Sequence, residues 1–87
     1  MEREKVYKLI DGERDYQEKV WNEDTTGSRG IYSEYEWLLF IQDYLTEAIH
    51  FASRKPEPDA RMFVRNSIRK ITAMGVCCME QNETPSR

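Results

Sequence analysis

The chain of 87 residues is poor in the residues that catalytic and metal sites most often use. It contains one histidine, His50, and two cysteines, Cys77 and Cys78, which are adjacent. Neighbouring cysteines rarely form a disulfide because the ring they close is strained, so a reducing cytoplasm is the default compartment. One histidine and two adjacent cysteines cannot fill a tetrahedral zinc site. We therefore expect no metal, no cofactor and no catalytic residue.

Long apolar runs and an excess of one charge are also absent. No run approaches the roughly 20 apolar residues of a membrane span. The charged first five residues are followed by no apolar segment, so no signal peptide is expected. Thirteen basic residues stand against sixteen acidic ones, a net charge of -3. This balance favours neither a DNA partner nor a membrane surface.

Apolar residues recur at intervals of three and four, which predicts three helices at about 2–22, 34–53 and 59–81. A polar, glycine-containing stretch at 22–30 and the prolines Pro56 and Pro58 separate them. Ser33 and Glu36 have the spacing of a capping box at the start of the second helix. Residues 83–87 form a polar tail that we expect to be flexible. No useful strand-like alternation is present, so the fold class is all-α and residues 1–87 form a single helical domain.

Two features refine this architecture. Gly12 lies in the polar middle of the first helix and costs up to about 1 kcal/mol relative to alanine. We therefore expect a bent or short N-terminal helix, or two short helices, packed on a long antiparallel helical hairpin. The second helix has a wider apolar arc than a three-helix monomer needs. Its surplus aromatic residues predict a homo-oligomer; they are Trp37, Phe40, Tyr44 and Phe51.

An acidic face on the second helix suggests one enzymatic function. Glu36, Asp43 and Glu47 share a side of this helix, and His50 follows three residues later. Such a face resembles half of the Mg²⁺ site of MazG-type nucleotide pyrophosphatases. The third helix, however, offers Arg65, Arg69 and Lys70 where those enzymes carry a second acidic cluster. The simpler interpretation is a solvated face with partial ion pairing.

A basic row follows on the third helix. Arg61, Arg65 and Arg69 are spaced four residues apart, so their guanidinium groups line one side. Arginine binds phosphate through a planar, two-pronged set of donors. The alternative is pairing with the acidic face of the second helix. The row is too short, and the chain too acidic, for duplex nucleic acid.

Aromatic and loop residues in the first third of the chain have the composition of a nucleotide site. Tyr7 and Trp21 could stack on bases, while a loop of hydroxyl, arginine and glycine residues could hold phosphate. The loop residues of interest are Thr25, Thr26, Ser28 and Arg29. The alternative is that both aromatic residues belong to a core or an interface.

Three stretches together resemble a known family. They are residues 9–17 (LIDGERDYQ), 43–48 (DYLTEA) and 68–82 (IRKITAMGVCCMEQN). The chain resembles the anti-CBASS cyclic-nucleotide sponges, small proteins of tailed phages, over nearly its whole length. The resemblance implies a compact helical protein that assembles into hexamers in the host bacterial cytoplasm. It implies sequestration, without cleavage, of cyclic dinucleotides such as 3',3'-cGAMP and cyclic trinucleotides such as cA3, so that the host effector is not activated.

The same resemblance implies roles for particular residues. Tyr7 matches the aromatic residue of the dinucleotide pocket, and Lys19 or Arg29 takes the role of its lysine. Arg69 matches the arginine that meets trinucleotides at a three-fold axis, with Arg65 as the alternative. Thr72 completes the expected ligand-binding set. The leading interpretation is thus a non-enzymatic sponge, and the alternative is a reduced, Mg²⁺-dependent MazG-like pyrophosphatase.

Overall fold

The structure is a computed structural model that describes residues 1–23, 31–54 and 56–87, with residues 21–23 described as backbone only. Three helices account for most of this part of the chain: α1 (Arg3–Glu23), α2 (Glu34–Ala52) and α3 (Asp59–Gln81). The described residues include no strand, which confirms the all-α class, and each helix boundary lies within one residue of its expected position. None of the three helices is long and apolar enough to cross a membrane.

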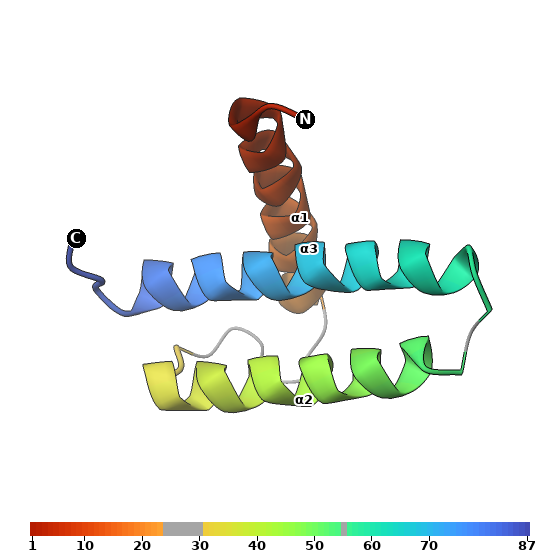
Figure 1. Ribbon diagram of the computed structural model, residues 1–87. Helices are drawn as coiled ribbons and strands as arrows, with labels where there is room; N and C mark the ends of the chain where they lie inside the picture. Colours follow the sequence, from red (N-terminus) through yellow and green to blue (C-terminus); the bar gives the residue numbers. More distant parts are fainter. Residues whose placement is uncertain (24–30, 55) are drawn as a thin grey trace.

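Helix α3 is the central element of the fold. It runs antiparallel to α2 to form a hairpin, and α1 crosses α3 near its middle (Figure 1). The N-terminal half of α1 projects away from the hairpin, so the first residues lie far from α2 (Figure 1). The Cα radius of gyration is 14.1 Å, against about 12 Å for a compact chain of this length. The chain is therefore more open than a typical small domain.

The start of α2 is determined locally by a capping box. The Ser33 hydroxyl accepts a hydrogen bond from the Glu36 amide at 3.2 Å, and the Glu36 carboxylate accepts one from the Ser33 amide at 3.1 Å. Both bonds satisfy amide groups that the first turn of a helix leaves open. The predicted capping box is confirmed.

The expectation of a short first helix, or of two short helices in its place, is wrong. Helix α1 continues through Gly12 and, at 21 residues, is longer than the 19-residue α2. A glycine lowers helix stability by only about 1 kcal/mol, which the contacts of neighbouring residues can offset. The polar segment around Gly12 is the part of α1 that packs on α3, as described below.

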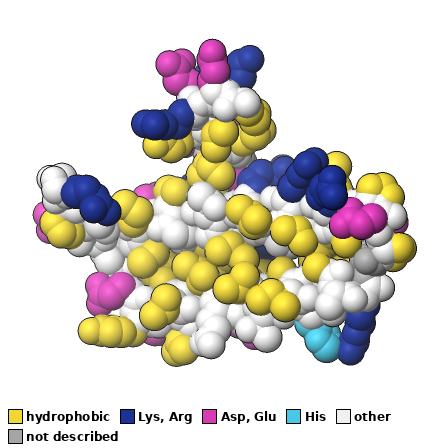
Figure 2. All heavy atoms as spheres, viewed as in Figure 1, with side chains coloured by type: hydrophobic (Ala, Val, Ile, Leu, Met, Phe, Trp, Pro, Cys, Tyr) yellow, Lys and Arg dark blue, Asp and Glu magenta, His cyan; other side chains and the backbone are white. Residues whose placement is uncertain are grey.

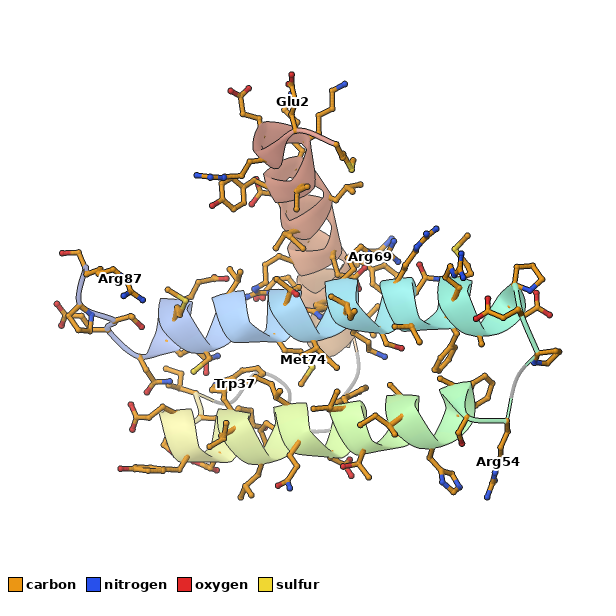
Figure 3. The ribbon with its side chains drawn as sticks, in the orientation of Figure 1. Glu2, Trp37, Arg54, Arg69, Met74 and Arg87 are labelled. Atoms are coloured by element: carbon orange, nitrogen blue, oxygen red, sulfur yellow. The ribbon has the colours of Figure 1, made fainter. Side chains whose placement is uncertain are left out.

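A small core holds the hairpin together. Trp37 from α2 packs on Met74 and Cys77 from α3, and all three are buried (Figure 3). The Gln81 side-chain oxygen accepts hydrogen bonds from the Trp37 indole at 2.7 Å and from the Tyr32 amide at 3.0 Å. These bonds join the end of α3 to the start of α2, so the hairpin is closed at the end opposite its turn.

The aromatic residues that predicted an oligomer make their contacts within the chain. Trp37 is buried, and Phe40 makes an edge contact with its ring at 5.7 Å between centroids. Phe51 stacks on Phe63 of α3 at 4.1 Å. Tyr44 lies beneath the Lys70 ammonium group. The prediction of an exposed surplus is therefore wrong for Trp37, whereas Phe40, Tyr44 and Phe51 remain 38%, 36% and 41% exposed.

A different face of α2 is apolar and open. Four exposed apolar residues and one glutamine recur at intervals of three and four along its outer side, and we call them the outer seam: Tyr35, Leu38, Gln42, Leu45 and Ile49. Their spacing is that of a seam between two packed helices. The surface of the chain is 7196 Å², against about 5,400 Å² expected for a folded monomer of this mass. Apolar side chains fill the line between α2 and α3, and others lie along the outer edge of α2 and around the projecting end of α1 (Figure 2).

Candidate functional site

A groove of about 390 Å³ is lined by residues from all three helices. Its walls combine aromatic rings, acidic groups and two basic groups. The lining residues are Glu13 and Tyr16 from α1; Tyr44, Glu47 and Ala48 from α2; and Phe63, Asn66, Ser67, Arg69, Lys70 and Ile71 from α3. A volume of this size is within the range of small-molecule sites.

Lys70, one of the two basic groups of the groove, lies beside an aromatic ring. The Lys70 ammonium nitrogen lies 4.5 Å from the centre of the Tyr44 ring, a cation–π distance. Phe63 is fixed by its stacking on Phe51. Tyr16 contributes a further, largely exposed ring from α1. The arrangement offers flat apolar surfaces for a base together with nearby donors for phosphate.

Arg69 is held at the junction of α1 and α3. Its Nε donates to the Glu13 carboxylate at 2.8 Å, and it lies on the side of α3 that faces α1 (Figure 3). Arg61 pairs within its own segment, with Glu57 at 3.6 Å. The alternative interpretation, pairing with the acidic face of α2, is therefore wrong for Arg61 and Arg69. The acids that the row uses are on α1 and in the turn before α3.

Two further polar contacts anchor the same part of α1. Gln17 is buried, and its side-chain amide donates to the Lys70 carbonyl oxygen at 3.1 Å. Arg14 donates to Glu80 at 2.6 Å and to Glu18 at 2.8 Å. The polar middle of α1 thus meets α3 through matched hydrogen bonds and charges rather than through an apolar stripe.

Burial and nearby charges shift the pKa values of two titratable groups where α1 meets α3. Burial alone would lower the pKa of Arg14, but its hydrogen bonds to Glu80 and Glu18 outweigh this and raise the pKa. Burial raises the pKa of the Cys77 thiol, against the opposing charge of Arg14. Arg14 therefore stays charged, and Cys77 stays a neutral, apolar core group.

The structure separates the residues expected to form the dinucleotide pocket. Tyr7 is exposed on the projecting half of α1, and Lys19 is twelve residues further along the same continuous helix. That spacing corresponds to about 18 Å along the axis and to different faces of the helix. One chain therefore does not bring Tyr7 and Lys19 together. The remaining members of that pocket lie outside the described residues; they are Thr25, Thr26, Ser28, Arg29 and the side chain of Trp21.

The residues expected to bind trinucleotides all lie on α3 but differ in their surroundings. Arg69 lines the groove, whereas Arg65 is exposed one turn earlier and does not. The Thr72 hydroxyl donates to the Ile68 carbonyl oxygen at 2.6 Å and is exposed. Arg69 is thus the member of this set that the structure associates with a cavity.

The acidic residues of α2 lie in different surroundings. Glu36 completes the capping box, and Glu47 lines the groove. Within the described ranges, no three His, Cys, Asp or Glu side chains are grouped so that they could hold a metal ion. The pyrophosphatase alternative thus gains no support from these residues.

The groove itself leaves no signal in the sequence. Glu13 and Tyr16 carry no local signal of binding, since they reach the site only through the crossing of α1 over α3. Lys70 and Phe63 flank the basic row in sequence, but helical spacing alone cannot show that they face Tyr44 and Phe51.

Comparison with family models, curated proteins and solved structures finds no match for this chain.

Proposed function

We propose that this protein is a homo-oligomeric sponge, which binds cyclic nucleotides made by a bacterial host and holds them without cleavage. The observation that carries the proposal is the groove, whose walls include Arg69, Lys70 and three aromatic rings, with Lys70 lying over the ring of Tyr44. Phosphate and base are the two parts of a nucleotide, and these are the two kinds of group that recognise them. The sequence resemblance to the anti-CBASS sponges supports the same conclusion. Such a protein would act in the host cytoplasm.

Assembly is part of this proposal. The chain exposes about 1,800 Å² more surface than a compact monomer of its mass, and the outer seam is a continuous part of that surface. A hexamer with three-fold and two-fold axes accommodates both expected ligand classes. Three copies of Arg69 around a three-fold axis would meet the three phosphates of a cyclic trinucleotide symmetrically.

The direct test is calorimetry with 3',3'-cGAMP and cA3, followed by denaturation of the protein and chromatography of the recovered ligand. A sponge returns each ligand intact, whether or not Mg²⁺ is present. The alternative, a MazG-like pyrophosphatase that uses Glu36, Asp43 and Glu47, would release nucleotide monophosphate only with Mg²⁺. Absence of binding to both ligands would refute the proposal.

Two substitutions separate the expected sites. Arg69→Ala should abolish cA3 binding. Each charge-assisted bond between arginine and phosphate contributes about 1.5–3 kcal/mol, and at a three-fold axis the bonds of all three arginines are lost together. Tyr7→Ala should weaken 3',3'-cGAMP binding by about ten- to a hundredfold, the effect of losing one base stack. Equal loss of both ligands in the Arg69 variant, with a lower melting temperature, would make Arg69 a structural residue instead.

A further inference from the structure

The ion pair between Glu13 and Arg69 is asymmetric in its exposure. The Glu13 side chain is 12% exposed and the Arg69 side chain is 43% exposed, although their hydrogen-bonded atoms are 2.8 Å apart. The bond uses Nε, the guanidinium nitrogen nearest the helix. The two terminal nitrogens are therefore the outermost donors of Arg69, and the same side chain lines the groove.

Glu13 is itself held on a fixed segment of α1. Its neighbour Arg14 pairs with Glu80, and Gln17, one turn later, is buried and bonded to the Lys70 carbonyl oxygen. Both bonds join α1 to α3, and the bond of Gln17 meets α3 at the residue that follows Arg69. The carboxylate is thus a rigid reference point, while a free arginine side chain would sample many rotamers.

These observations lead to a role for Glu13 that rests on the proposed function. We propose that Glu13 is a positioning residue: it holds Nε of Arg69 so that the terminal nitrogens are presented, already ordered, to a ligand phosphate. It also offsets the positive charge of Arg69 in the empty protein, which reduces repulsion wherever copies of Arg69 approach one another. The residue acts through Arg69 and does not itself contact the ligand.

Charge and geometry are separated by two substitutions at this position. Glu13→Ala removes the acceptor for Nε, whereas Glu13→Gln keeps an acceptor oxygen and removes the charge. In calorimetry, Glu13→Ala should lower the affinity for cA3 about threefold for each arginine that contacts the ligand. If three copies of Arg69 contact one cA3 molecule, the affinity should fall about 30-fold. Glu13→Gln should stay within about threefold of the wild-type affinity or bind more tightly.

A matched control comes from the other arginine pair of the same region. Glu57→Gln removes the same charge from the exposed partner of Arg61, which does not line the groove. Its cA3 affinity should equal that of the wild type. The Nε–H resonance of Arg69 in NMR spectra provides a readout of positioning that is independent of ligand. It should exchange slowly with solvent in the wild type and in Glu13→Gln, and rapidly in Glu13→Ala.

A double-mutant cycle tests whether Glu13 acts through Arg69. Lysine lacks Nε, so Glu13→Ala should have no further effect on cA3 affinity in an Arg69→Lys background. A persistent effect there, or an affinity in Glu13→Ala equal to or tighter than that of the wild type, would overturn the inference. Loss of binding in Arg69→Ala with no change in Glu13→Ala would overturn it while leaving the proposed function intact. Wild-type affinity in Arg69→Ala would instead show that the proposed site is wrong.

Discussion

Replacement of Leu38 by lysine should disrupt self-association without unfolding the chain. Leu38 lies within the outer seam of α2, is 64% exposed, and faces away from α3. The substitution therefore removes no contact of the small core formed by Trp37, Met74 and Cys77. Between two copies, it would place two ammonium groups where two leucine side chains pack.

The size of the effect follows from area and symmetry. The surface excess of about 1,800 Å² per chain exceeds the ~800 Å² that each partner buries in a standard interface. Burial of one leucine side chain contributes about 1.5–3 kcal/mol, and a two-fold contact counts each substitution twice. A loss of about 3 kcal/mol or more corresponds to at least a hundredfold rise in the dissociation constant.

Light scattering coupled to size-exclusion chromatography, over a range of protein concentrations, measures this change. The wild type should remain an oligomer at micromolar concentration, and Leu38→Lys should shift toward smaller species with an unchanged helical circular-dichroism spectrum. Ile31→Lys is the matched control, because Ile31 is equally apolar, is 81% exposed and lies outside the outer seam. A wild-type monomer, or an assembly that Leu38→Lys leaves intact, would refute this role for the seam.

Three further predictions concern the chain itself. Gln81→Ala should lower the free energy of unfolding by about 1–3 kcal/mol, because it removes an acceptor from the buried Trp37 indole; urea unfolding followed by tryptophan fluorescence measures this, and a loss below about 0.5 kcal/mol would contradict it. Gly12→Ala should stabilise the protein by about 0.5–1 kcal/mol, because a Cβ there meets no atom within 4 Å; a lower melting temperature would show a hidden constraint. Burial raises the pKa of Cys77, so less thiolate forms at a given pH and its alkylation at pH 8 should be slower than that of Cys78 in single-cysteine variants. Equal rates would indicate that the core opens readily.

The helices could be predicted from sequence because their signals are local. Periodicity and the Ser33–Glu36 capping box depend on residues at most a few turns apart, and both were confirmed. The continuity of α1 could not be predicted in the same way. Gly12 weakens the helix locally, whereas the opposing contacts come from Arg69, Lys70 and Glu80, more than fifty residues further along the chain.

The candidate site shows the same division. Helical spacing identified the basic row on α3, but it could not identify Glu13 as the partner of Arg69. The two residues are 56 positions apart, and helical spacing relates only residues that are close in sequence. It also could not divide the wide apolar arc of α2 into an inner and an outer face. That division depends on which side α3 covers: Trp37 lies in the core, whereas the residues of the outer seam are exposed.

The projecting half of α1 connects assembly with ligand binding. Val6, Tyr7 and Leu9 are exposed in this half of α1, which points away from the hairpin (Figure 1). A few helical turns are marginally stable in water on their own, so this segment gains most from a surface supplied by another copy. If Tyr7 stacks on a base in such a contact, the ligand binds the assembled form more tightly than the separate chains. Linkage then requires the ligand to stabilise the assembly to the same extent. A chain with so small a core would thus obtain its stability and its binding surface from the same contacts.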